Sequence, residues 1–121
     1  MQIGCHGLVW TGTYEPEGIR RAVGKTSEAG FDLIEFPLMD PFSFDVDTAR
    51  ESLEKHGIAA SGSLGLDDSK DISSEDLDAA RAGEALLLRA VEVLADLGAE
   101  HLCGIIYSAM RKYMDLSLIH I

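Results

Sequence analysis

Basic residues are scarce in this sequence of 121 residues, which has 10 Lys and Arg against 21 Asp and Glu and a net charge of −11. An acidic surface repels phosphate groups, so we expect neither nucleic acid nor an anionic membrane as a partner. No apolar run is long enough for a membrane helix, and the first residues lack the basic and apolar pattern of a signal peptide. We therefore expect a soluble protein of the cytoplasm.

Cysteine is also rare, and the two that occur, Cys5 and Cys103, lie in short apolar runs without a C-x-x-C spacing. This placement predicts reduced thiols buried in the fold. The histidines form no H-x-H or H-E-x-x-H pair; they are His6, His56, His101 and His120. Neither a complete metal site nor a nucleophile triad can be assembled from these residues.

What the sequence does contain is a repeated unit, an amphipathic stretch that ends at glycine and is followed by a short apolar run. Gly30, Gly57 and Gly98 mark its three copies, and glycine ends a helix at little cost in the left-handed conformation. The pattern predicts helices over about 16–29, 46–56 and 74–97, and strands over 2–6, 33–36, 58–63 and 101–106. We expect residues 64–72 to form a polar loop.

The expected order is β-α-β-α-β-α-β, which is typical of a parallel sheet covered by helices. Two architectures fit this α/β order: an open doubly wound sheet, or the N-terminal half of a (β/α)8 TIM barrel. A complete barrel needs about 250 residues, so residues 1–114 would supply four of its strands.

Two helix starts can be predicted from polar residues. Asp45 is expected to cap the second helix, and Ser73 with Asp76 to form a capping box before the third. The core-facing side of the third helix is predicted from apolar residues at helical spacing, namely Leu77, Ala80, Leu87, Leu88, Val91 and Leu94.

Candidate site residues lie where the predicted strands end, because parallel α/β proteins bind ligands there. Glu35 is either an acid in a pocket or a structural carboxylate held by a basic group or a backbone N–H. His6 could be a ligand or proton carrier, or a histidine at the edge of the core. Trp10 could stack on a sugar or cover the rim. Residues 62–65, read GSLG, are a weak candidate for a phosphate cradle.

The last residues read LSLIHI and have two interpretations. They could form a fifth strand, but too few residues separate them from the fourth for a parallel crossover. They also resemble the translation of a transposon-end adapter used for sequencing libraries. We expect the second, which would make residues 115–121 a non-native tail of a truncated reading frame and leave His120 without a function.

The motifs at the strand ends resemble the ketose 3-epimerases (D-tagatose, D-psicose and L-ribulose 3-epimerases) of the xylose-isomerase-like superfamily. They follow in family order across nearly all of residues 1–114 and read IGCHGLVW, EAGFDLIEF, ASGSLGL, KDISSED and LGAEHLCGIIYSA. The resemblance implies a TIM barrel that epimerises free ketoses at C3 through an enediolate, with manganese or cobalt as cofactor. It also implies a homo-oligomeric parent protein.

In that family two glutamates act as acid and base and bind the metal with an Asp and a His, and all four lie beyond residue 114. The resemblance therefore implies that this chain alone is inactive and lacks catalytic and metal residues. It implies a substrate-lining role for His6, Trp10, Tyr14, Glu35, Ser63, Ile105 and Met110. His6 and Met110 stand where relatives have aromatic residues, and Glu35 matches a recurrent acid with no assigned chemical step.

Two other functions stay open at this point. The parent could be another enzyme of the superfamily, such as a hydroxypyruvate isomerase or an inosose dehydratase. Alternatively, the chain could be a non-catalytic half-barrel that self-associates through the unpaired edges of its first and fourth strands.

Overall fold

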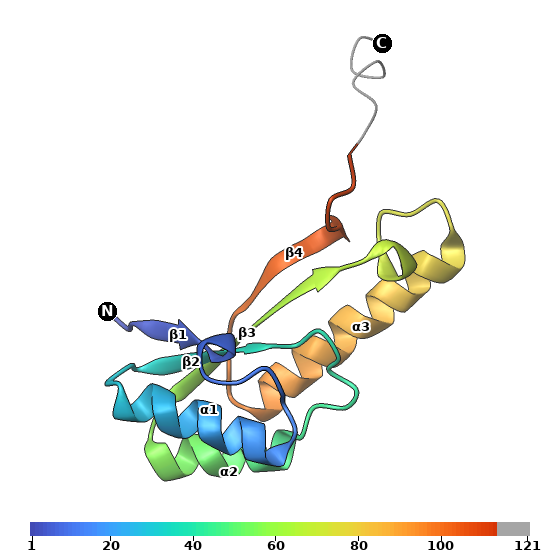
Figure 1. Cartoon of the computed structure of the whole chain (residues 1–121). Coiled ribbons are helices and arrows are strands. Elements are labelled where there is room, and N and C mark those ends of the chain that lie inside the picture. Colours follow the sequence, from blue (N-terminus) through green and yellow to red (C-terminus); the bar gives the residue numbers. More distant parts are fainter. Residues whose placement is uncertain (114–121) are drawn as a thin grey trace.

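The computed structural model describes residues 1–113, in which four parallel strands alternate with three helices (Figure 1). The strands pair in the order β1-β2-β3-β4. Their bounds are β1 Gly4–His6, β2 Leu33–Pro37, β3 Ala59–Leu66 and β4 Leu102–Ala109. The helices are α1 Pro16–Glu28, α2 Val46–His56 and α3 Leu77–Asp96, and two short 3-10 helices are η1 Gly7–Val9 and η2 Asp68–Lys70.

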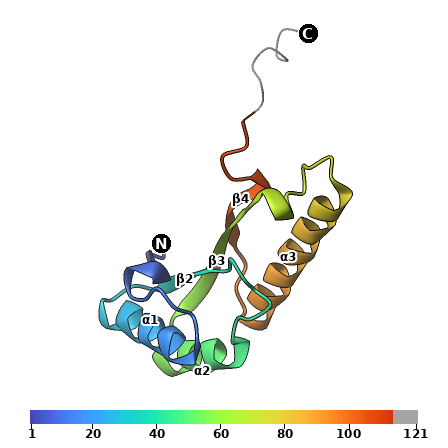
Figure 2. The same cartoon turned by 45° about the vertical axis from the view of Figure 1, so that its right-hand side comes forward.

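All three helices cover the same, convex face of a curved sheet, and the concave face is left open (Figure 2). A doubly wound sheet would instead carry helices on both faces and reverse its strand order. The sequential order and the one-sided helices are those of a TIM barrel, so the predicted N-terminal half of a (β/α)8 barrel is confirmed.

Local signals in the sequence determine several helix ends as expected. Gly57 follows α2 with φ of 64°, and Gly30 follows α1 with φ of 85°, both in the left-handed region. The carboxylate of Asp45 accepts from the backbone N–H of Thr48 at 3.0 Å and caps α2. These contacts are local in sequence, which is why they could be predicted.

The start of α3 differs from the prediction. Asp76 itself is the N-cap and accepts from the N–H of Asp78 at 2.9 Å, while Ser74 Oγ accepts from the N–H of Asp76 at 3.1 Å. The capping box of Ser73 and Asp76 is therefore wrong, because Ser73 is engaged in a turn with Asp71.

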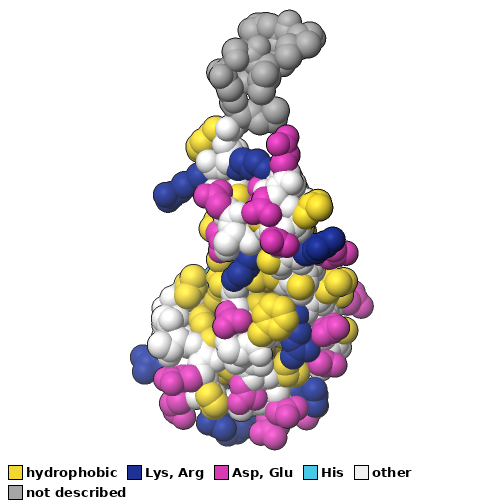
Figure 3. Space-filling model, turned by 90° about the vertical axis from the view of Figure 1, so that its right-hand side faces the viewer, with side chains coloured by type: hydrophobic (Ala, Val, Ile, Leu, Met, Phe, Trp, Pro, Cys, Tyr) yellow, Lys and Arg dark blue, Asp and Glu magenta, His cyan; other side chains and the backbone are white. Residues whose placement is uncertain are grey.

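The core-facing side of α3 matches the predicted one only at Leu94, which is buried, and at Leu87, which packs against the core. Its buried residues are Ala79, Gly83, Leu86, Ala90, Val93 and Leu94. Leu77, Leu88 and Val91 are more than half exposed. Figure 3 views the side of the molecule on which α3 lies, and apolar side chains are scattered there among charged ones. The helix is apolar on more than one side, so periodicity alone could not select the side that packs on the sheet.

The last two strands run further than the sequence pattern predicts. Residues 64–66 continue β3, because Leu64 and Leu66 point into the core, and η2 occupies part of the expected polar loop. Residues 62–65 are thus in mid-strand: the N–H of Gly62 donates to His101 O, and that of Gly65 faces Met39 Sδ. The phosphate cradle suggested for them is wrong.

Strand β4 extends to Ala109 through an irregularity in its pairing with β3. Gly65 pairs with Ile105, but Leu66 pairs with Ala109, and the N–H of Met110 then donates to Leu66 O at 2.8 Å.

No helix within residues 1–113 is long and apolar enough to cross a membrane. The predicted tail, residues 115–121, lies outside the described residues.

Candidate functional site

The open concave face of the sheet carries a polar cluster contributed by all four strands. Side chains alternate between the two faces of a strand, and Ile34 and Phe36 are buried under the helices whereas Glu35 lies half-buried on the opposite face. We call His6, Glu35, Ser63 and Cys103 the cross-strand cluster; one residue comes from each of β1 to β4. Three residues named from the sequence are thus in contact.

The contacts within the cluster run through His6 and Glu35. His6 Nε2 lies 3.2 Å from Ser63 Oγ and 3.5 Å from Glu35 Oε1, and the thiol of Cys103 donates to Glu35 Oε2 at 3.2 Å. The side chains of His6 and Glu35 are 33% and 30% exposed, so both reach the open face. Among residues 1–113, no Lys or Arg forms an ion pair with Glu35, which makes its partners a histidine and a thiol.

Cys103 corrects the prediction that both cysteines are buried. Cys5 is half-buried, but Cys103 is exposed because it points to the concave face. Partial burial and the hydrogen bond and charge of Glu35 raise the pKa of the Cys103 thiol. The sequence offered no signal for this contact, since Glu35 and Cys103 are separated by 68 positions and meet only through strand register.

Tyr14 lies in a separate cleft between the loops that follow β1 and β2. The cleft has a volume of about 540 Å³ and is lined by Leu8, Gly12, Tyr14, Glu15, Pro37, Met39, Asp40, Ser43 and Phe44. The Tyr14 hydroxyl is buried without a hydrogen-bond partner among the described residues, and burial raises its pKa to about 12. The Tyr14 hydroxyl lies so close to Gly7 that a Cβ at position 7 would collide with it.

Trp10 is directed toward helix α1. Its indole N–H donates to Thr26 Oγ1 at 3.0 Å, and the fully buried Thr26 in turn donates to Ala22 O at 2.8 Å. This bond ties the loop after β1 to α1. The polar edge of Trp10 is therefore engaged within the fold, and the structure does not bring it together with the cross-strand cluster.

The remaining two residues named from the sequence lie along β4 and just after it. Ile105 is opposite Gly65 in the sheet, and Met110 packs on Gly65 so closely that a Cβ there would lie 2.5 Å from its sulfur. Met39 reaches the same glycine, whose N–H donates to its Sδ at 3.3 Å. Met39 was missed, because nothing in the sequence indicates that a loop methionine reaches the next strand.

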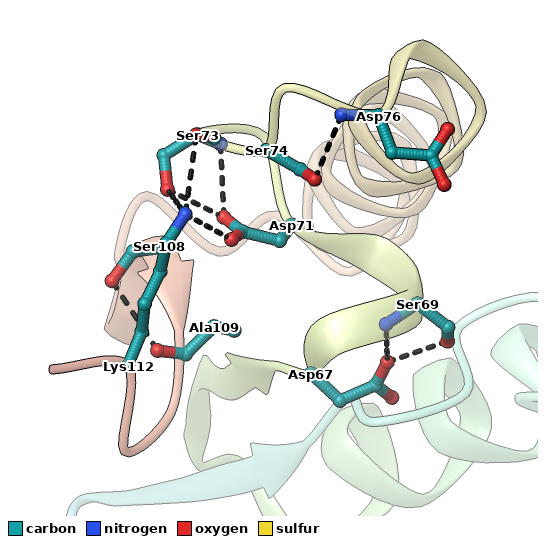
Figure 4. A network of polar contacts seen from close by, with 9 residues as sticks. All are labelled: Asp67, Ser69, Asp71, Ser73, Ser74, Asp76, Ser108, Ala109 and Lys112. Carbon is teal, nitrogen blue, oxygen red and sulfur yellow. Dashed lines mark hydrogen bonds and ion pairs between the residues drawn. The ribbon is translucent and has the colours of Figure 1, made fainter. Parts of the chain in front are cut away.

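A second polar network fastens the end of β4 to the loop after β3 (Figure 4). Lys112 Nζ donates to Asp71 Oδ2 at 2.7 Å and to Ser73 Oγ at 2.8 Å, and Asp71 Oδ1 accepts from the N–H of Ser73 at 2.9 Å. The Asp71 carboxylate is almost completely buried. The network holds the segment that contains Met110 over β3.

The hydrogen bond from Lys112, followed by those from Ser73, lowers the pKa of Asp71 to about 2. A carboxyl with a pKa below its unfolded value stabilises the fold above the unfolded pKa and loses that contribution as pH falls. We expect the free energy of unfolding to fall between about pH 4 and pH 2, and Asp71→Asn to remove this part of the acid dependence while destabilising the fold at pH 7.

The measurement is urea unfolding of the full chain, followed by circular dichroism at pH 7 and at a series of acid pH values. Glu100→Gln is the matched control, since Glu100 is exposed and has no side-chain partner among the described residues. An Asp71→Asn variant with the stability and the acid profile of the parent would contradict the role of the network.

The described residues contain no complete metal site. No group of three or more His, Cys, Asp or Glu side chains within residues 1–113 is placed to hold a metal ion. The described residues therefore do not by themselves fit the divalent ion that the family resemblance implies, whose ligands that resemblance places beyond residue 114.

The chain is similar in sequence to proteins named ketose 3-epimerase and L-ribulose 3-epimerase. The chain is 68% identical over 115 residues to the ketose 3-epimerase of Arthrobacter globiformis, a match that covers 95% of the chain and 40% of the relative. It is 39% identical over 113 residues to the L-ribulose 3-epimerase of Methylomonas sp., with 93% and 40% covered. No family model matches the sequence.

Solved structures agree with these sequence matches. D-allulose 3-epimerase from Methylomonas sp. in complex with D-allulose superposes with a TM-score of 0.91 at 38% identity, covering 95% of this chain and 40% of that one. An L-ribulose 3-epimerase structure superposes with a TM-score of 0.85 at 31% identity, with 94% and 38% covered. The chain spans about 40% of the length of the relatives it matches, and its described fold matches the N-terminal half of a TIM barrel.

Proposed function

We propose that this chain is the substrate-lining half of a metal-dependent isomerase that epimerises free ketoses at C3 through an enediolate. The observation that carries the proposal is the cross-strand cluster, which lies on the concave face of a half-barrel whose sequence is 68% identical to a ketose 3-epimerase. The relatives named L-ribulose 3-epimerase and D-allulose 3-epimerase support a ketose as substrate class.

In this proposal the described residues bind and orient the sugar. His6, Glu35 and Ser63 offer polar groups on the open face, while Ile105 and Met110 border it with apolar surface. Tyr14 lines the neighbouring cleft. Trp10 holds the loop after β1 against α1 through its hydrogen bond to Thr26. The manganese or cobalt ion would stabilise charge on the enediolate oxygens; it and the acid–base pair would be supplied by later strands of the barrel.

The test is a hybrid barrel in which residues 1–113 replace the matching segment of the Arthrobacter globiformis enzyme. We expect the hybrid to epimerise D-allulose, EDTA to abolish that activity, and manganese to restore it. The 121-residue chain alone is expected to be inactive, because the acid, the base and the metal ligands would be missing. Sugar products are measured by chromatography, with the unmodified relative as control.

A hybrid that folds by circular dichroism but does not epimerise any ketose would overturn the proposal. If such a hybrid is found and the 121-residue chain forms a discrete dimer by size exclusion, the open edges of β1 and β4 favour the alternative, a non-catalytic half-barrel that associates by strand pairing.

A further inference from the structure

The hydrogen bonds of His6 define which of its ring nitrogens carries the proton. The backbone N–H of Leu8 points at His6 Nδ1 at 3.1 Å, and His6 is the N-cap of η1. A backbone N–H can only donate, so Nδ1 must be the acceptor and a neutral ring must carry its proton on Nε2. The tautomer follows from a contact between residues two positions apart.

The proton on Nε2 then determines the direction of the next bond. Nε2 faces Ser63 Oγ at 3.2 Å and Glu35 Oε1 at 3.5 Å, so the serine oxygen is an acceptor from His6 and the carboxylate lies beside the same N–H. A hydroxyl that accepts through its oxygen keeps its own hydrogen for another partner. Within residues 1–113, Ser63 Oγ has no hydrogen-bond partner other than His6.

Glu35 is the residue that connects these groups across the sheet. One of its oxygens lies beside the N–H of His6 on β1, and the other accepts the thiol of Cys103 on β4 at 3.2 Å. The two carboxylate oxygens thus face donors from β1, the strand paired with β2, and from β4, which lies beyond β3. The carboxylate favours an N–H over a bare ring nitrogen in front of it, which reinforces the tautomer that Leu8 selects.

We propose that Glu35 is the positioning residue of this face: together with the N–H of Leu8 it holds His6 as the Nε2–H tautomer, which leaves the Ser63 hydroxyl as the hydrogen-bond donor to ligand. A donor of this kind recognises a hydroxyl or carbonyl oxygen, as carried by a free sugar. The identity of the ligand rests on the proposed function, whereas the tautomer and the role of Glu35 rest on the contacts alone.

The first test needs no substrate. Nitrogen-15 NMR of the full chain reports which ring nitrogen of His6 carries the proton, and a His6→Gln variant assigns its signals. We expect Nε2 to be protonated and Nδ1 unprotonated at neutral pH. A ring protonated at Nδ1, or an even mixture of tautomers, would overturn the proposal.

The second test uses Glu35→Gln, which keeps the size of the side chain and removes its charge. Because Glu35 contributes to the raised pKa of the Cys103 thiol, we expect Cys103 to be alkylated by iodoacetamide severalfold faster in the variant at pH 8. Cys5 serves as the internal reference in the same peptide map. An unchanged ratio of the two rates would show that Glu35 does not hold the thiol.

The third test concerns the ligand and uses the hybrid barrel with D-allulose. Ser63→Ala should raise KM about tenfold with kcat little changed, because one hydrogen bond to a bound hydroxyl contributes about 1.4 kcal/mol. Ser61→Ala is the matched control on the same face of β3, since the Ser61 side chain makes no hydrogen bond among the described residues. Equal KM values for both variants would overturn the donor role of Ser63.

These three tests distinguish a failure of the proposed function from a failure of the positioning role of Glu35. An inactive hybrid in which His6 has the expected tautomer and Cys103 responds to Glu35→Gln would contradict the proposed function and leave the positioning role of Glu35 intact. An active hybrid in which the tautomer is reversed would do the opposite.

Discussion

Gly104→Ala is expected to destabilise the chain by about 2–4 kcal/mol, since it combines backbone strain with a collision. Gly104 has φ of 113°, a conformation that side chains rarely adopt, and a Cβ there would collide with the carbonyl oxygen of Leu64 on β3. The glycine lies between Cys103 and Ile105, so strain at this position also disturbs the edge of the cross-strand cluster.

Thermal unfolding of the full chain measures this effect, and a fall in Tm of roughly 10–20 °C corresponds to it. Gly12→Ala is the matched control: no atom lies within 4 Å of its added Cβ, and its φ is not in the left-handed region. A Gly104→Ala variant as stable as Gly12→Ala would show that β3 and β4 do not approach as closely as described.

Phe36→Ala is expected to cost about 3–5 kcal/mol, the usual loss for an aromatic residue removed from a core. Phe36 on β2 is fully buried and contacts Phe44 edge-on, with ring centroids 5.3 Å apart, and Tyr14, with centroids 6.4 Å apart. Both partners line the cleft beside the cross-strand cluster. Loss of the ring should therefore loosen the cleft as well as the core.

Urea unfolding of the full chain measures the loss, and Phe42→Ala provides the comparison. Phe42 lies in the loop between β2 and α2 and is 63% exposed, so its removal should change the stability by less than about 0.5 kcal/mol. If the two variants lose the same stability, Phe36 is not the centre of the packing between β2 and the helices.

Local signals between residues close in the chain were mostly read correctly from the sequence, the capping box of Ser73 and Asp76 being the exception. Gly30, Gly57 and Asp45 mark helix boundaries through contacts within a few residues. The ends of β3 and β4 were placed too early, because their extension depends on pairing between Leu66 and Ala109, which are separated by a whole helix. The buried side of α3 was misjudged since both sides carry leucines.

In the candidate site, too, some residues could be predicted from the sequence, whereas others are brought in only by the tertiary structure. His6, Glu35 and Ser63 could be named because each lies near the end of a predicted strand and in a motif of the resembling family, and they do meet on one face. Two further residues could not be named: Cys103, which donates to Glu35, and Met39, which accepts from the N–H of Gly65. They take these positions through strand register and a loop path that carry no sequence signal. Asp71 and Lys112 are also far apart in the chain, and their contact likewise depends on how β3 and β4 pair.

By itself, the sequence determined the repeated helix–glycine–strand unit, the parallel α/β class and the relation to ketose 3-epimerases. Each of these depends on residue order and on contacts over a few positions. Only the tertiary structure decided that Glu35 lies between a histidine and a thiol, with no Lys or Arg as an ion-pair partner among the described residues. That arrangement arises from the curvature and register of four strands, which bring together side chains that no local pattern connects.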